Sequence, residues 1–280
     1  MAKQRLDTLL VNLNLCTSRQ QAQALIRTGK VAVNQQVVDK PGTEVDISAS
    51  IQIKERSRYV SRGGDKLAKA LEVFAIPVTD RICLDGGIST GGFTDCLLQA
   101  GAAKVYGIDV GYGQADWGLR NDPRVILKER TNLRYMTATE LYGDSQRADL
   151  AVVDVSFISL DKVLPALWEL LAPPREAVLL VKPQFEVGRE RVGKKGVVRD
   201  SATQADAIFQ VWKAATALGW EQRGLTWSPL LGPAGNIEYL LWLGSDRQQQ
   251  SEQNAVEDSV MKERIAEVTQ GAKGELIDKF

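Results

Sequence analysis

The chain has 280 residues, with 35 Lys and Arg, 35 Asp and Glu, three Cys and no His. Without histidine the protein cannot be a Ser-His-Asp or Cys-His hydrolase, and it cannot bind zinc or iron through histidine. If it is an enzyme, Lys, Asp, Glu, Tyr or Cys must move its protons.

Hydropathy and cysteine usage indicate the compartment. No run approaches the ~18 apolar residues that span a bilayer, and no signal-peptide apolar region follows the first residues. Cys16, Cys83 and Cys96 are scattered and form no C-x-x-C pair, which is typical of reduced thiols. We therefore expect a cytoplasmic protein with no membrane partner and no metal.

The first 55 residues predict a small α+β domain. Leucines from Leu6 to Leu15 have helical spacing, a second helix is expected over 18–28, a hairpin turns at Asn34, and a last strand covers 47–53. Residues 1–66 carry eleven Lys or Arg against six Asp or Glu, a balance of +5. A basic module on a chain without net charge favours a polyanionic partner.

The next segments are expected to be a linker and a larger domain. Residues 56–64 are basic, end in glycine and lack apolar periodicity, which indicates a linker. A catalytic domain is expected over 65–244 and begins with a helix at 66–74. Residues 245–280 are polar and predict a mobile tail outside the core with a weak helix.

Short apolar segments alternate with helical ones through the larger domain. This pattern is typical of a mainly parallel, doubly wound α/β sheet, so we predict a Rossmann-like fold with a small N-terminal α+β domain. The expected strands are 82–84, 105–109, 125–127, 150–154, 177–181, 224–228 and 238–243.

A glycine-rich turn follows the first of these strands. It reads DGGISTGGFT over 85–94 and fits neither the G-x-G-x-x-G dinucleotide pattern nor a phosphate-binding P-loop. Asp85 can face a ligand ammonium, and Asp109, at the end of the second strand, can accept two ribose hydroxyls. An ammonium and a ribose without phosphate are features of S-adenosylmethionine.

Three charged residues flank later strands, at the edge where such folds place their chemistry. Asp154 and Lys182 end strands, and Glu238 begins one. A lysine at the end of an apolar strand is costly to bury alone, so we expect Asp154 and Glu238 to be its partners.

Six stretches together carry a family resemblance. The chain resembles the TlyA (haemolysin A-like) family of ribosomal RNA 2′-O-methyltransferases, whose catalytic domain is FtsJ-like and whose N-terminal domain is an alpha-L RNA-binding domain. The stretches are SRGGDKL (61–67), STGGFTDC (89–96), YGIDVG (106–111), DVSFIS (154–159), VKPQFE (181–186) and GNIEY (235–239).

The resemblance implies an enzyme that uses S-adenosylmethionine to methylate a ribose, expected to be of cytidine, in ribosomal RNA or in ribosomal subunits. It implies a catalytic Lys-Asp-Lys-Glu tetrad, which falls on Lys66, Asp154, Lys182 and Glu238. The candidate cofactor residues are Asp85, Gly87, Ser89, Thr90, Gly91, Gly92, Phe93, Asp109 and Asn132. The candidate RNA-binding residues are Arg5, Arg19, Arg27, Lys30, Arg58 and Arg62.

By this hypothesis Lys182 accepts or polarises the proton of a ribose 2′-hydroxyl, and carboxylates orient its amine; the protonation state of Lys182 stays open. Three alternatives remain. A nucleotide-dependent oxidoreductase is disfavoured by the failed glycine pattern. A membrane-acting haemolysin is disfavoured by the lack of a signal or span. A ribosome-assembly protein that binds RNA without catalysis is disfavoured by the complete tetrad.

Overall fold

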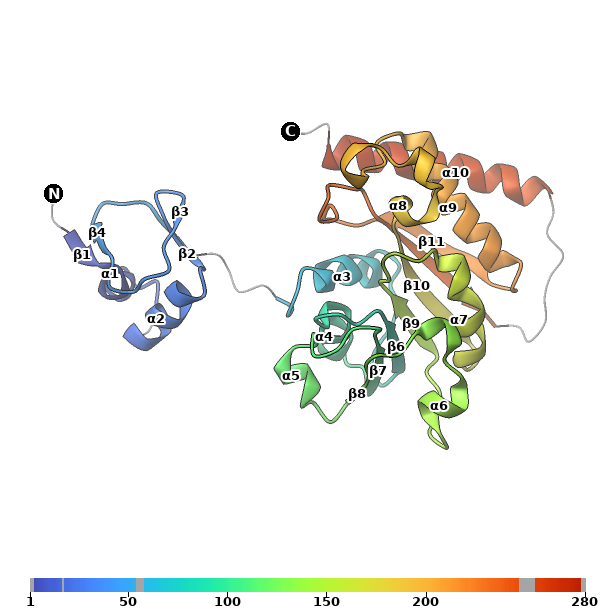
Figure 1. The fold of residues 1–280 in the computed structure, drawn as a ribbon, viewed down its shortest axis with the longest axis horizontal. Coiled ribbons are helices and arrows are strands. Elements are labelled where there is room, and N and C mark those ends of the chain that lie inside the picture. The colour runs from blue at the N-terminus through green and yellow to red at the C-terminus, as the bar shows by residue number, and fades with distance from the viewer. Residues whose placement is uncertain (1–2, 17, 54–57, 247–254, 278–280) are drawn as a thin grey trace. The chain divides into compact units, whose positions relative to one another are not determined.

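The computed structural model describes residues 3–16, 18–53, 58–246 and 255–277 (Figure 1). The chain divides into two compact units, Met1–Ser57 and Arg58–Phe280. We refer to them as the N-terminal unit and the C-terminal unit and describe each by itself.

The N-terminal unit packs two helices against two small sheets around Leu6, Leu10 and Ile26, which are fully buried. The hairpin turns at Asn34 as expected. The predicted last strand is confirmed over Ile51–Ile53 but is wrong over its first part, where Ile47 is half exposed in a turn that follows a separate strand. The elements are β1 (Lys3–Arg5), α1 (Leu6–Asn12), α2 (Arg19–Arg27), β2 (Val31–Val33), β3 (Gln36–Val37), β4 (Glu44–Asp46) and β5 (Ile51–Ile53).

A seven-stranded sheet forms the centre of the C-terminal unit, in the order β11-β12-β10-β9-β6-β7-β8. In this sheet β12 is antiparallel to both β10 and β11, and the other six strands run in one direction, so the predicted mainly parallel, Rossmann-like sheet is confirmed. The strands are β6 (Ile82–Gly86), β7 (Lys104–Ile108), β8 (Val125–Lys128), β9 (Leu150–Val153), β10 (Arg175–Val181), β11 (Glu221–Trp227) and β12 (Tyr239–Ser245).

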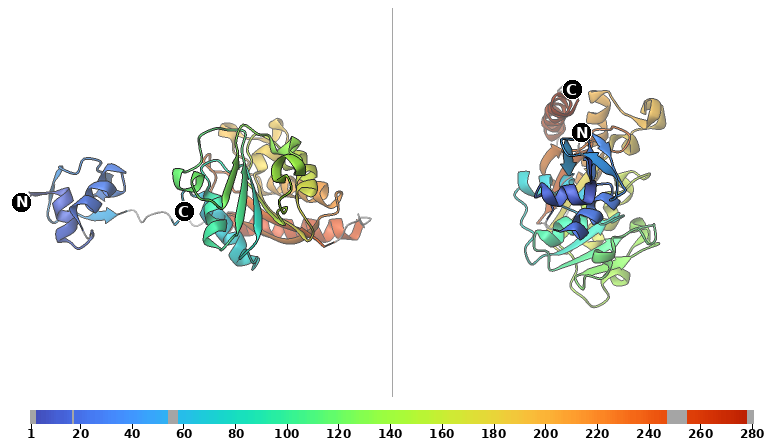
Figure 2. Two further views of the ribbon diagram at one scale, coloured as in Figure 1. Left: turned by 90° about the horizontal axis from the view of Figure 1, so that it is seen from below. Right: turned by 90° about the vertical axis from the view of Figure 1, so that its left-hand side faces the viewer.

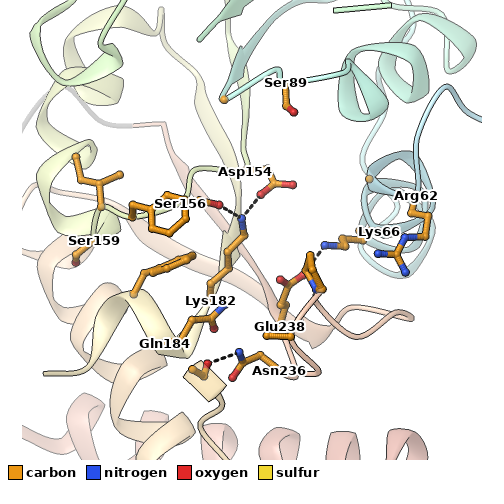
Figure 3. Close-up of a pocket in the computed structure, with 18 of the residues that line it drawn as sticks. Arg62, Lys66, Ser89, Asp154, Ser156, Ser159, Lys182, Gln184, Asn236 and Glu238 are labelled. Atoms are coloured by element: carbon orange, nitrogen blue, oxygen red, sulfur yellow. Dashed lines mark hydrogen bonds and ion pairs between the residues drawn. The ribbon is translucent and has the colours of Figure 1, made fainter. Parts of the chain in front are cut away.

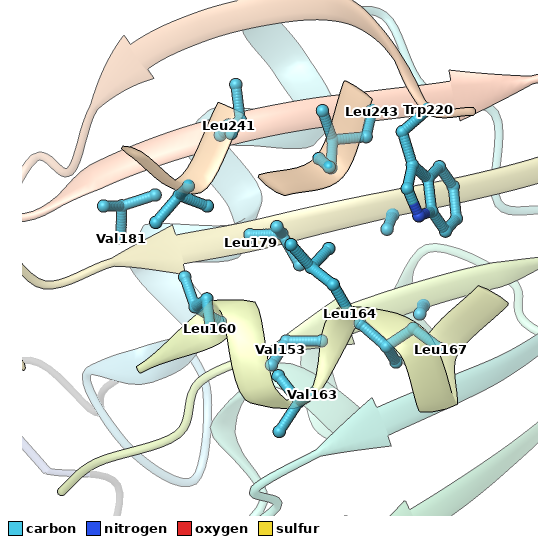
Figure 4. Close-up of a cluster of buried hydrophobic side chains, with 14 of the residues drawn as sticks. Val153, Leu160, Val163, Leu164, Leu167, Leu179, Val181, Trp220, Leu241 and Leu243 are labelled. Atoms are coloured by element: carbon cyan, nitrogen blue, oxygen red, sulfur yellow. The ribbon is translucent and has the colours of Figure 1, made fainter. Parts of the chain in front are cut away.

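Helices cover both faces of this sheet, because alternate residues of each buried strand point to opposite sides. Val153, Leu179 and Leu241 pack with α7 and α9 on one face (Figure 4), and Val152 and Leu180 pack with α3 and α4 on the other. The helices are α3 (Gly63–Val73), α4 (Gly92–Gln99), α5 (Trp117–Arg120), α6 (Ala138–Tyr142), α7 (Leu164–Leu170), α8 (Pro183–Glu186), α9 (Ser201–Thr216) and α10 (Ala255–Leu276), with 3-10 turns at η1 (Leu133–Tyr135), η2 (Leu160–Lys162), η3 (Arg189–Arg191) and η4 (Lys194–Gly196).

The predicted linker is corrected over its second half. Residues 58–64 pack on the C-terminal unit: Tyr59 is buried, the Val60 amide donates to Asp95, and α3 begins at Gly63. A Cβ on Gly64 would overlap the Tyr59 ring, so the glycines that suggested flexibility instead permit close packing. Residues 56 and 57 lie outside the described part of the chain.

The predicted mobile tail is also corrected. Residues 247–254 and 278–280 lie outside the described residues, but α10 packs beside α9 and β11 (Figures 1 and 2). Met261, Ile265 and Ala272 are buried in the same core cluster as the sheet. Their spacing places them on one face of the helix.

Candidate functional site

A cavity of about 1120 Å³ opens where β6, β9 and β10 end (Figure 3). All four tetrad residues line it. Asp154 directly follows β9, and Lys182 directly follows β10. Because β12 is reversed and Val181 pairs with Tyr239, Glu238 leaves the sheet at the same edge.

Lys66 and Glu238 form one buried ion pair. The Lys66 Nζ donates to Glu238 Oε2 at 2.5 Å, and the two residues are 8% and 1% exposed. Lys66 lies in the first turn of α3, and so it reaches the sheet edge from the helix layer. A buried charge without this partner would be strongly destabilising.

Lys182 forms the second pair. Its Nζ lies 2.6 Å from Asp154 Oδ1 and donates to Ser156 Oγ at 2.8 Å (Figure 3). The sequence suggested that Lys182 has both carboxylates as partners, but Glu238 pairs with Lys66 instead. Since an ammonium has three N–H groups, one of those of Lys182 stays available to a ligand in the cavity.

The glycine turn lies directly beside Asp154. Gly87 has φ +89°, and a Cβ there would overlap the carbonyl oxygen of Asp154, so only glycine fits. Gly91 has φ +96° and precedes α4. The turn therefore brings bare backbone to the wall of the cavity, which is lined by Gly87, Ser89, Thr90, Gly92 and Phe93 of the predicted cofactor residues.

Asp85 is a fully buried carboxyl group under this turn. Its Oδ2 accepts a hydrogen bond from Thr94 Oγ1 at 2.6 Å, and its Oδ1 has no partner among the described residues. Burial, opposed by the Thr94 hydrogen bond and reinforced by the nearby Asp154, raises the pKa of Asp85 to about 7. A buried carboxylate oxygen without a partner fits a cationic ligand.

Four of the predicted cofactor residues do not line the cavity: Asp85, Gly91, Asp109 and Asn132. Both Asp109 oxygens accept backbone N–H groups, from Ser89 at 2.8 Å and from Gly111 at 2.7 Å. Asn132 Oδ1 accepts from the Arg134 amide at the start of η1. The contact of these residues with a cofactor stays a prediction. The geometry shows that Asp109 stabilises the glycine turn, because it accepts the hydrogen bond from the Ser89 amide.

Two aromatic rings on the other side of the cavity were missed by the sequence reasoning. Phe157 has φ +64°, is 92% exposed, and its ring centroid lies 5.1 Å from that of Phe185. Glu186 holds the same loop, since it accepts from Ser159 Oγ and the Leu160 amide. Phe157 lies inside the DVSFIS stretch that carries the family resemblance, but the sequence does not show that its ring is exposed, because the exposure depends on the backbone conformation.

The predicted RNA-binding residues divide between the units. Arg5 and Arg19 both donate to the buried carboxylate of Asp7, at 3.0–3.1 Å, and the Arg5 hydrogen bond is the main reason that the pKa of Asp7 falls well below its usual value. Asp7 thus holds the two guanidinium groups together. Arg27 is exposed and Lys30 half buried in the same unit, whereas Arg58 and Arg62 are exposed in the C-terminal unit.

Within the described part of the chain, no group of three or more Cys, Asp or Glu side chains is arranged to hold a metal ion. None of the described helices has the length and apolar character needed to cross a membrane.

Comparison with known proteins identifies the family. The model of the FtsJ-like methyltransferase matches residues 59–245, and the S4 domain matches residues 4–51. The chain belongs to the FtsJ-like methyltransferase family. The FtsJ-like segment contains the whole cavity described above, and the S4 segment corresponds to the N-terminal unit.

Several relatives match most of this FtsJ-like chain. It is 49% identical to the 16S/23S rRNA (cytidine-2′-O)-methyltransferase TlyA of Mycobacterium tuberculosis, over 91% of this chain and 95% of the relative. It is 40% identical to Hemolysin A of Brachyspira hyodysenteriae, over 84% and 98%. A solved structure described as a hemolysin from Streptococcus thermophilus is 41% identical, with a TM-score of 0.75 over 100% of this chain and 98% of that one.

Proposed function

We propose that this protein transfers a methyl group from S-adenosylmethionine to the 2′-hydroxyl of a cytidine ribose in ribosomal RNA. The observation that carries the proposal is the pair of lysine–carboxylate contacts, Lys66–Glu238 and Lys182–Asp154, that face one cavity beside the glycine turn. We place the activity in the cytoplasm, with the ribosomal subunits.

The residues present fit the methyl donor. Asp85 Oδ1 has no hydrogen-bond partner among the described residues and suits the ammonium of the methionyl part, and the glycine turn lines the cavity with backbone at the end of β6. When bound, S-adenosylmethionine would supply the methyl group from its positively charged sulfur, which would keep the electron pair of the broken carbon–sulfur bond and leave as a neutral thioether. We expect Asp85 and the turn from Gly87 to Phe93 to hold it.

The two ion pairs suit the other substrate. The remaining N–H of Lys182 can donate to the oxygen of a ribose hydroxyl, and the Asp154 carboxylate beside it can receive the proton that this hydroxyl loses on methylation. Lys66 and Glu238 hold the opposite wall. Placement and exclusion of water then supply most of the rate enhancement.

The exposed aromatic ring suits a nucleobase. Phe157 offers an open face at the mouth of the cavity, next to Phe185. An enzyme that modifies a ribose inside folded RNA must first draw the nucleotide out, and unstacked bases bind aromatic faces. The base therefore has a surface on which to stack while its ribose enters the cavity.

The names of the relatives support rRNA as the substrate. TlyA of Mycobacterium tuberculosis is named for 16S and 23S rRNA, and TlyA of Campylobacter jejuni, 39% identical over 66% of this chain, for 23S rRNA. We propose that the N-terminal unit, with its S4 domain and its arginine pair on Asp7, binds rRNA while the C-terminal unit methylates it.

The test is to map 2′-O-methyl groups on rRNA from cells with and without this protein. Cells restored with the natural chain should regain the methyl group, and cells restored with Lys182→Ala should not, although the purified variant still binds S-adenosylmethionine. Lys162→Ala is the control, since Lys162 pairs with Asp161 on the surface. Full methylation by the Lys182 variant would refute the catalytic assignment.

A further inference from the structure

A basic loop follows α8 in the C-terminal unit. Residues 188–199 hold five Lys or Arg against one Glu, although the whole chain has no net charge. Arg189, Arg191, Lys194, Lys195 and Arg199 are all exposed. A local excess of this size needs an explanation other than overall composition.

Buried amides fix the conformation of this basic loop. Asn236, 1% exposed, donates to the Gly196 carbonyl at 2.8 Å (Figure 3) and accepts from the Val198 amide at 2.9 Å. Gln204, also buried, donates to the Val198 carbonyl at 2.7 Å. Lys195 is held at φ +64°, a conformation that is uncommon for lysine. These hydrogen bonds hold the backbone of the loop in one conformation, so its cations leave the backbone at defined positions.

Most of the cations in the basic loop have no counter-charge. Arg191 pairs with Asp206 at 2.6 Å. Arg189, Lys194, Lys195 and Arg199 form no ion pair with any described residue. Four unpaired cations close together repel one another, so an anionic partner stabilises this arrangement.

The basic loop also borders the catalytic cavity. Arg189, Val192, Gly193 and Gly196 form part of its wall. Asn236, which clamps the loop, is two residues from Glu238 of the tetrad and lines the same cavity. A polyanion whose nucleotide enters this cavity therefore comes close to the basic loop.

We propose that the basic loop 188–199 binds the phosphate backbone of the substrate RNA beside the nucleotide that enters the cavity. This inference rests on the proposed function and deepens it, because it gives the C-terminal unit its own RNA contact. Lysine and arginine at a backbone contact position the RNA without reading its sequence. The S4 domain then does not carry all of the affinity.

The test uses the full chain with Lys194→Ala and Lys195→Ala combined. The matched control combines Arg264→Ala and Lys273→Ala, which removes two exposed cations from α10, away from the cavity wall. Ribosomal subunits and protein-free rRNA, both from cells lacking this protein, serve as probes at several salt concentrations. We expect the loop variant to bind about three- to tenfold more weakly than the control, with a salt slope smaller by roughly one to two units.

The KM for subunits should rise by a similar factor, while affinity for S-adenosylmethionine equals that of the control. Equal RNA affinity and salt slope in the two variants would overturn the proposal. So would weaker binding to subunits without weaker binding to protein-free rRNA, since the loop would then contact a ribosomal protein. Absence of methylation by the natural chain refutes the proposed function instead, and the affinity measurements still decide the role of the loop.

Discussion

Lys66 and Glu238 are 172 residues apart in the sequence, yet the lysine ammonium lies 2.5 Å from the carboxylate, and both are buried. The pair joins helix α3 to the start of β12, so it closes one wall of the cavity. Its strength therefore affects both the stability of the C-terminal unit and the catalytic arrangement.

Removing one partner of this pair should be costly. Glu238→Ala leaves the Lys66 ammonium buried without a counter-charge, so we expect a loss of about 3 kcal/mol in the free energy of unfolding and loss of methylation. Urea denaturation and a methylation assay measure the two effects. Arg124→Ala, which breaks the exposed pair with Asp122, is the control and should cost less than about 1 kcal/mol. Equal costs in the two variants would contradict a buried pair.

Stability should fall as pH rises towards neutrality in the ligand-free protein. The pKa of Asp85 is raised to about 7 by burial, whereas an unfolded chain releases this proton near 4. Between these pH values the folded state holds more protons, so raising the pH disfavours it. Asp85→Asn removes this contribution, and thermal unfolding between pH 5 and pH 8 measures it. Because burial also raises the pKa of Glu186 to about 7, only the difference between the natural chain and the variant is assigned to Asp85.

The same carboxyl group should link ligand affinity to pH. An ammonium next to Asp85 requires the ionised form, so S-adenosylmethionine should bind more tightly as pH rises to about 7 and release a proton below it. Calorimetry in buffers of different ionisation enthalpy measures that proton. Proton release that persists unchanged in Asp85→Asn would show that another group is responsible.

The glycine turn should tolerate no side chain at Gly87. Gly87→Ala combines an unfavourable φ with overlap at the Asp154 carbonyl oxygen. We expect it to destabilise the protein by about 1–3 kcal/mol more than Gly113→Ala, because Gly113 also has positive φ but open space around it. Urea unfolding of both variants separates the steric cost from the backbone cost. Equal free energies of unfolding for the two variants would contradict the close approach of Gly87 to the Asp154 carbonyl oxygen.

Helix α10 should behave as part of the core. Ile265→Ala removes a side chain that is 1% exposed and should cost about 2–4 kcal/mol. Val260→Ala, on the same helix and 61% exposed, should change stability by no more than about 0.5 kcal/mol. Comparable stability of the two variants in chemical denaturation would restore the expectation of a loosely attached tail.

The sheet was predictable because short, continuous apolar segments that alternate with helical ones mark the buried strands of a parallel sheet. Six of its seven strands do share one direction. The errors have particular physical reasons. The apolar stripe Met261, Ile265 and Ala272 is sparse among polar residues, and only packing on α9 shows that it is buried. The glycines at 63 and 64 suggested a linker, but at Gly64 the missing Cβ makes room for the ring of Tyr59.

The sequence by itself determined which residue types handle protons, where Asp154 and Lys182 leave their strands, and that glycine dominates the turn before α4. Only the tertiary structure decided which carboxylate faces which lysine, that Asp85 is buried without a second partner in the described part of the chain, and that the basic loop borders the cavity. The physical reason is that strand ends follow from local pattern, whereas the neighbours of a side chain depend on sheet order and helix packing. Because β12 is reversed, Glu238 lies at the edge at which Lys182 leaves the sheet. Helix α3 places Lys66 beside Glu238, so these two residues form the ion pair.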